Sequence, residues 1–149
     1  MRKTVVLPTW RESPAGELDE PNSAYATITD HGTHRRVAFS GGLAVEPDDA
    51  AEQVRTVLAR RREALRDFGG SMDGVVVTRY YVRADHLSRG TQAEIHAARD
   101  EFFERPHYPA STMVGVADLL HGDALVEVEV EAEIPEDDWD VAVLTEEDV

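Results

Sequence analysis

The C-terminal part of the chain carries the clearest pattern of hydrophobic and polar positions. From Leu125 to Ile134, apolar residues alternate with four glutamates. Because successive side chains of a strand point to opposite faces, this period places the apolar residues on one face and the glutamates on the other. In a helix the valines would be spread around the circumference and their β-branches would crowd. The pattern therefore predicts a half-buried strand.

Two segments have the period of amphipathic helices. The first starts at Pro47-Asp48-Asp49, whose acidic side chains can cap free N–H groups, and ends at Gly69-Gly70, which suits a left-handed cap. Its apolar stripe consists of Val54, Val57, Leu58, Leu65 and Phe68. The arginine run 60–62 is interpreted as part of its solvated face, together with Arg55, Glu63 and Arg66. The second helix is expected to start at a capping box, Thr91-Gln92-Ala93-Glu94, to bury Ile95, Ala98 and Phe102, and to stop at Pro106.

The remaining strands are shorter or less regular. Val5-Val6-Leu7 predicts an edge strand, and 25–29 and 36–40 predict a hairpin around Asp30-His31-Gly32-Thr33-His34. The β-branched and aromatic run 74–83 lacks clean alternation, which favours a central strand covered on both sides. Pro109–Ala117 supplies another strand before the one described first. His31 and His34 are interpreted as turn residues and not as metal ligands.

This element order predicts an α+β fold in which two helices pack on one face of a mixed β-sheet. We expect residues 1–134 to form a single domain, with an N-terminal edge strand and loop over 1–22. Residues 135–149 are expected to form a loosely attached acidic tail, although its apolar patch, Trp139 and Val141 to Leu144, could dock on the domain. Nothing in the chain covers the other sheet face. Its apolar side chains are expected to need a partner subunit, which predicts a homo-oligomer.

Composition excludes several classes of function. The chain has no cysteine, so it has no thiol nucleophile, disulfide or thiolate metal site. No apolar run reaches the ~20 residues of a membrane span, and no signal-peptide stretch precedes the domain, so a cytoplasmic protein without membrane partners is expected. A net charge of −15 disfavours nucleic acid as a partner. We interpret the acidity as adaptation to a high-salt, halophilic cytoplasm.

Several short motifs follow one another along the chain: Val37-Ala38-Phe39-Ser40-Gly41, Phe68-Gly69-Gly70-Ser71-Met72-Asp73-Gly74-Val75-Val76, Tyr80-Tyr81-Val82-Arg83-Ala84-Asp85, Glu101-Phe102-Phe103, Pro109-Ala110-Ser111-Thr112 with Val116-Ala117, and Val126-Glu127-Val128-Glu129. Taken in this order, they resemble the RidA family, also called YjgF or L-PSP proteins. They span residues 23–134 with the family's spacing. The resemblance implies a chorismate-mutase-like fold and a homotrimer with clefts between subunits. It also implies hydrolysis of reactive enamines and imines without cofactor or metal.

The resemblance also implies roles for individual residues. Glu127 occupies the position of the glutamate that positions water, and Ser40, Gly41, Tyr81, His96 and Arg105 are candidate substrate-binding residues. Ser111 stands where the family has the arginine that holds the substrate carboxylate, so the chain resembles a divergent member. Pro21-Asn22-Ser23 replaces an element with a tyrosine, and His96 replaces an asparagine. Losing a charged hydrogen bond of roughly 1.5–3 kcal/mol is expected to weaken binding tenfold to a hundredfold.

The sequence leaves two functions open: an enamine or imine deaminase, and a trimer that binds a small molecule without turnover. In the second case Glu127 is one of four structural glutamates, paired with Arg79 and Arg83 of a neighbouring strand. Arg105 or His107 could act as a displaced cation, or could merely cap a helix. An endoribonuclease is disfavoured, because the chain lacks a basic surface studded with aromatic residues.

Overall fold

The fold is a mixed six-stranded sheet with two helices on one face, as the sequence predicted. The computed structural model describes residues 1–9, 12–13, 16–17 and 21–149. The strands of the main sheet are β1 (Arg2–Val6), β4 (Ala26–Asp30), β5 (His34–Phe39), β6 (Val75–Arg83), β7 (Ala110–Val116) and β8 (Val126–Pro135). They lie side by side in the order β1-β4-β5-β8-β6-β7. Only the pairing of β6 with β7 is parallel.

Strand β8 lies in the middle of the sheet and alternates as predicted. Its apolar side chains Val126, Val128, Val130, Ala132 and Ile134 are buried, and the glutamates between them are half-buried on the other face. Strand β6 is paired on both sides, but it is not covered on both faces. Its alternate residues Arg79, Tyr81 and Arg83 lie on the face that no helix covers. The prediction of a strand covered on both sides was therefore wrong for the single chain.

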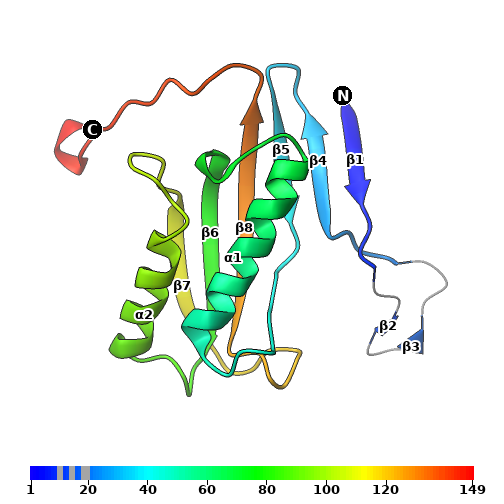
Figure 1. Cartoon of the computed structure of the whole chain (residues 1–149), viewed down its shortest axis with the longest axis vertical. Coiled ribbons are helices and arrows are strands. Elements are labelled where there is room, and N and C mark those ends of the chain that lie inside the picture. The colour runs from blue at the N-terminus through cyan, green and yellow to red at the C-terminus, as the bar shows by residue number, and fades with distance from the viewer. Residues whose placement is uncertain (10–11, 14–15, 18–20) are drawn as a thin grey trace.

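The helices α1 (Ala50–Asp67) and α2 (Arg89–Asp100) run across the same face of the sheet (Figure 1). Asp49 caps α1 as expected, because its side chain accepts a hydrogen bond from Glu52 N at 3.0 Å. Gly69, with φ of +88°, reverses the chain after α1. The predicted start of α2 was wrong by one turn. Its N-cap is Ser88, whose hydroxyl accepts from Thr91 N at 3.1 Å.

The core lies between the helices and the sheet. The fully buried side chains of α1 and α2 include Val54, Leu58, Leu65 and Ile95. Phe102 is only half-buried, and Phe103 is buried instead. Two further short strands, β2 (Glu12–Ser13) and β3 (Gly16–Glu17), pair with each other outside the main sheet. The other residues of the predicted loop at 10–20 lie outside the described part.

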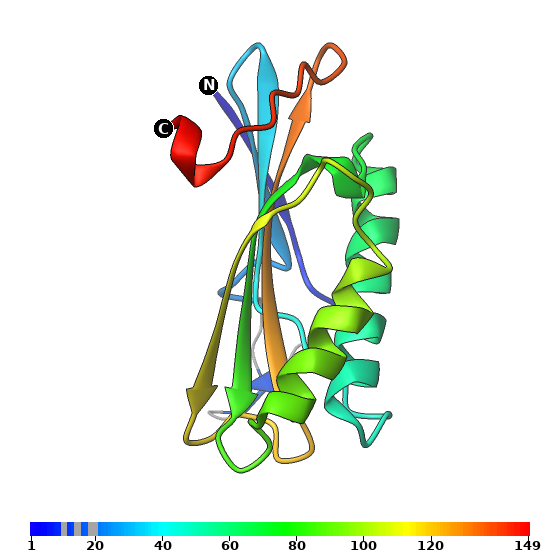
Figure 2. The ribbon, with the colours of Figure 1, turned by 90° about the vertical axis from the view of Figure 1, so that its left-hand side faces the viewer.

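The sheet face opposite the helices is open (Figure 2). It is not the apolar surface that the sequence predicted. Arg36 lies 3.1 Å from Glu131 and 3.3 Å from Glu133, and Arg79 lies 3.2 Å from Glu131. Crossed arginine–glutamate pairs thus cover the middle of this face, since charged residues of β5, β6 and β8 come into register there.

The segment after β8 extends away from the sheet on the side opposite the helices (Figure 2). Trp139 lies against His107, with ring centroids 6.4 Å apart, while Val143 and Leu144 are exposed. The segment ends in a short 3-10 turn, η2 (Glu146–Asp148). A second such turn, η1 (Met72–Gly74), precedes β6.

Candidate functional site

The loop Ser40-Gly41-Gly42 lies beside Glu127 on the open face of the sheet. Gly42 and Val128 exchange two backbone hydrogen bonds of 2.8 Å, which tie the loop to β8. A Cβ atom at Gly41 would lie 2.9 Å from Cδ of Glu127. A larger residue would displace the Glu127 carboxylate, so glycine at position 41 leaves the space that the carboxylate occupies.

Arg61 of α1 holds this loop from the helix side of the sheet. It is 4 % exposed, and its Nη1 donates to the Tyr25 hydroxyl at 2.8 Å and its Nη2 to the Ser40 carbonyl at 3.1 Å. Its guanidinium carbon lies 4.9 Å from the ring centroids of both Tyr25 and Phe39. Burial lowers the pKa of Arg61 despite its contact with Tyr25. The interpretation of the run 60–62 as solvated is therefore wrong for its middle residue.

Glu127 differs from the other glutamates of β8. Glu129, Glu131 and Glu133 each lie within 3.6 Å of an arginine nitrogen, whereas Glu127 has no ion pair among the described residues. Burial raises the pKa of Glu127, and the negative charge of Glu129 raises it further. Among the glutamates of this face, Glu127 is therefore the one whose carboxylate is best suited to accept a proton.

The predicted pairing of Arg79 and Arg83 with these glutamates holds for Arg79 alone. Arg83 lies beyond the end of the glutamate row, where its Nη2 contacts Asp118 at 2.7 Å and its Nε donates to the Ala124 carbonyl at 2.7 Å. Tyr81 stands opposite Glu127 in the register, but its hydroxyl donates to Glu129. Neither residue neutralises Glu127.

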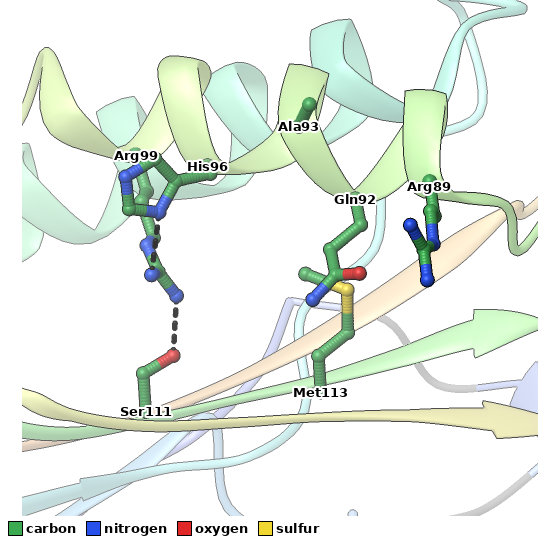
Figure 3. A pocket seen from close by; sticks show the side chains of 7 residues that line it. All are labelled: Arg89, Gln92, Ala93, His96, Arg99, Ser111 and Met113. Atoms are coloured by element: carbon green, nitrogen blue, oxygen red, sulfur yellow. Dashed lines mark hydrogen bonds between the residues drawn. The ribbon is translucent and has the colours of Figure 1, made fainter.

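A second group of predicted residues meets between α2 and β7 (Figure 3). Arg99 of α2 donates from Nη1 to the Ser111 hydroxyl at 2.5 Å and from Nη2 to His96 Nδ1 at 2.8 Å. These three residues line a cavity of about 770 Å³, whose other lining residues are Arg89, Gln92, Ala93 and Met113. Arg105 lies in an adjoining hollow of about 300 Å³, which Ser111, His96 and Arg99 also line.

The two groups lie on opposite faces of the sheet within one chain. Ser111 pairs in the register with Thr78, which is buried under the helices, whereas Glu127 pairs with Tyr81 on the open face. The structure therefore brings Ser40, Gly41 and Glu127 together, with Tyr81 opposite Glu127. Separately, it brings Ser111, His96 and Arg105 together. A site that uses both groups has to be built from two copies of the chain.

Two residues of the site were missed from the sequence. Arg61 lies within a run of arginines whose members look alike in sequence. Arg99 follows His96 by three positions, a spacing that places both on one helix face. That spacing was the available signal, but only the packing of α2 on β7 shows which strand residue the pair meets.

Other polar clusters are simpler. His31 and His34 stack at the β4–β5 turn, with ring centroids 4.9 Å apart. His107 lies 4.0 Å from Asp73 and next to Trp139, outside the residues that line either hollow at Ser111. These histidine clusters do not amount to a metal site: within the described residues, no group of three or more His, Asp or Glu side chains is placed to hold a metal ion. No helix in this part of the chain has the length and hydropathy to cross a membrane.

Several solved structures resemble this chain over most of its length. A protein of the YjgF/YER057c/UK114 family from Mycobacterium tuberculosis is 26 % identical, with a TM-score of 0.69, over 89 % of this chain and 100 % of that one. A YjgF-family protein from Neisseria meningitidis is 22 % identical, with a TM-score of 0.70, over 93 % and 98 %. RidA from an Antarctic Psychrobacter is 20 % identical, with a TM-score of 0.65, over 88 % and 99 %.

The search of curated proteins found no match. The sequence profile of the family described as Endoribonuclease L-PSP, however, matches residues 18–134, which include both groups of site residues. The order of helices and strands also agrees with the fold of the similar structures. The chain therefore belongs to the L-PSP family, also called the YjgF or RidA family.

Proposed function

We propose that the protein hydrolyses a small, reactive imine or enamine in a cleft formed between copies of the chain. The observation that carries this proposal is the state of Glu127. It is half-buried, lacks a cationic partner among the described residues, has a raised pKa and faces the close backbone of Gly41. A carboxylate in such surroundings is suited to general base catalysis.

The proposed reaction needs only water and one carboxylate. Glu127 accepts a proton from water while the water oxygen bonds to the imine carbon and the carbon–nitrogen π electrons move to nitrogen. Glu127 then passes this proton to nitrogen, which gives a carbinolamine. As the carbon–nitrogen bond breaks, the hydroxyl proton is transferred through the Glu127 carboxylate to the leaving nitrogen, so that the carbonyl forms and ammonia leaves. An enamine enters the same sequence after protonation at carbon gives the imine. No redox partner is consumed.

An assembly is part of the proposal. Glu127 and Ser111 occupy opposite faces of one subunit, so a cleft that contains both requires a neighbouring copy. We propose the homotrimer that the family resemblance implies. Light scattering behind size exclusion in KCl should give about three times the 16.5 kDa chain mass, and a monomer would contradict the proposal.

The second candidate function is ligand binding without turnover. Ser111 favours it, because a hydroxyl in the family's arginine position carries no charge to hold a substrate carboxylate. Endoribonuclease activity is disfavoured by the net charge of −15, which repels phosphate backbones.

Ammonia release from 2-iminopropionate in high salt distinguishes these functions. Wild type should release ammonia above the buffer rate, and Glu127→Gln should lower the rate by about 100-fold or more, as expected for loss of a general base. Glu133→Gln is the matched control, because Glu133 lies on the same strand and face but pairs with Arg36. No release from wild type, with release appearing in Ser111→Arg, would refute catalysis on this substrate and leave the binding function.

A further inference from the structure

The guanidinium of Arg99 reaches the strand position from which the arginine is missing. Its Nη1 lies 2.5 Å from the Ser111 hydroxyl oxygen, so the charge that position 111 lacks is supplied from α2 (Figure 3). The ring of Tyr80 lies below it, with its centroid 5.8 Å from the guanidinium carbon. The position of the cation is therefore defined by contacts to α2, β6 and β7.

The hydrogen bonds of Arg99 leave capacity for a ligand. His96 accepts through Nδ1, and the Ser111 oxygen accepts from Nη1, so the Ser111 hydroxyl proton is free to donate elsewhere. A guanidinium has more N–H donors than these two bonds use. Arg99 and Ser111 together can thus present several donors to one carboxylate, in the forked arrangement that favours arginine over lysine.

The charge of the cavity is opposite to that of the protein. Arg89, His96 and Arg99 line the 770 Å³ space without an aspartate or glutamate, although acidic residues outnumber basic ones by 30 to 15 in the chain. Arg36, Arg55, Arg79 and Arg83 each pair with a carboxylate. Arg99 has no such partner among the described residues, and its free charge faces the space.

We propose that Arg99, with Ser111 and His96, forms the binding site for the carboxylate of a small organic acid, and so makes up for the arginine absent from position 111. The inference rests on the proposed function for the identity of the acid, a 2-imino acid or its 2-oxo acid product. The site itself lies within one chain. Arg89 adds positive potential at the far end of the same cavity.

Binding of pyruvate, measured by calorimetry in KCl without other carboxylates, tests the site without turnover. Wild type should bind saturably, and Arg99→Gln should weaken binding about tenfold to a hundredfold. Arg2→Gln is the charge-matched control, because Arg2 is exposed on β1, at the sheet edge opposite β7. The double variant Arg99→Gln/Ser111→Arg should recover pyruvate binding, since it moves the guanidinium from α2 to position 111 of β7.

Pyruvamide, a neutral analogue, tests whether wild type recognises the carboxylate of the ligand. It should bind at least about tenfold more weakly than pyruvate. The inference is overturned if wild type does not bind pyruvate, if pyruvamide binds as tightly, or if Arg99→Gln binds like Arg2→Gln. Pyruvate binding that depends on Arg99, without ammonia release from 2-iminopropionate, would refute the proposed hydrolysis and leave this inference standing. If wild type releases ammonia and the KM for 2-iminopropionate is unchanged in Arg99→Gln, the inference about Arg99 is refuted and the proposed hydrolysis stands.

Discussion

Truncating Arg61 to alanine should destabilise the protein far more than truncating its neighbour Arg60. Arg61 is 4 % exposed and holds Tyr25 and Ser40, whereas Arg60 is exposed and makes one long contact of 3.4 Å to the Leu43 carbonyl. The two residues share a helix, a side-chain type and a charge. Their difference in stability therefore isolates burial and hydrogen bonding from net charge.

The magnitude follows from the contacts. Two hydrogen bonds from a charged donor contribute about 1.5–3 kcal/mol each, and contacts with two aromatic rings add about 1 kcal/mol. Removing Arg61 also relieves the desolvation that lowers its pKa, and its Nε has no partner among the described residues. Setting these against each other, we expect Arg61→Ala to lower the free energy of unfolding by about 2–4 kcal/mol. Arg60→Ala should change it by at most about 0.5 kcal/mol.

Urea unfolding at fixed KCl concentration measures both variants, and equal slopes would show that the denatured states are comparable. Arg61→Lys should lie between wild type and alanine, because an ammonium keeps the charge but cannot reach both oxygens as a fork. If Arg61→Ala and Arg60→Ala unfold within about 0.5 kcal/mol of each other, then the buried guanidinium is not what holds the Ser40 loop.

The remaining predictions concern pH and helix capping. The raised pKa of Glu127 means that the native state binds the extra proton, so stability from this group is present below the unfolded pKa and is lost as pH rises. Glu127→Gln should therefore stabilise the protein at pH 8 but not at pH 4. For Glu131, burial alone would raise the pKa, but hydrogen bonds and charges from Arg36 and Arg79 outweigh burial, and the net pKa is lowered. Stability from this group is therefore present above the unfolded pKa and is lost as pH falls. Glu131→Gln should destabilise the protein at pH 8, and the loss of stability should shrink at pH 4. Urea unfolding at both pH values checks this pair: the two substitutions should change the free energy of unfolding with opposite signs at pH 8, and both changes should shrink at pH 4. Ser88→Ala should destabilise by about 1 kcal/mol in the same assay, and Thr91→Ala by less.

Local patterns in the sequence were enough to predict most of the fold. The alternation of β8 and the caps of α1 depend on residues close in sequence, and both were confirmed. The start of α2 was wrong because Ser88 and Thr91 both have capping side chains, and they hydrogen-bond to each other at 3.1 Å. The sequence around these two residues does not show that Ser88 is the N-cap and that Thr91 is the residue whose N–H group it caps.

The candidate site was less accessible to sequence reasoning, because it depends on register and packing. Arg79 and Arg83 are two residues apart, yet one lies opposite Glu129 and the other lies past the row of glutamates. A shift of the register would have placed Arg83 beside Glu127 and neutralised it. Arg61 likewise acquires its environment from Tyr25 and Phe39, which are far away in sequence.

The geometry separates the proposed carboxylate-binding site from the proposed catalytic residue. Arg99, His96 and Ser111 belong to one chain and one side of the sheet, and they need no neighbour to hold a carboxylate. Glu127 lies on the other side, so its carboxylate can act on a ligand held at Arg99 only when that Arg99 belongs to another copy. Loss of assembly would therefore remove hydrolysis and spare binding. A ligand that bridges Arg99 of one copy and the Ser40 loop of another would bind the assembly more tightly than the free chain, and it would therefore also stabilise the assembly.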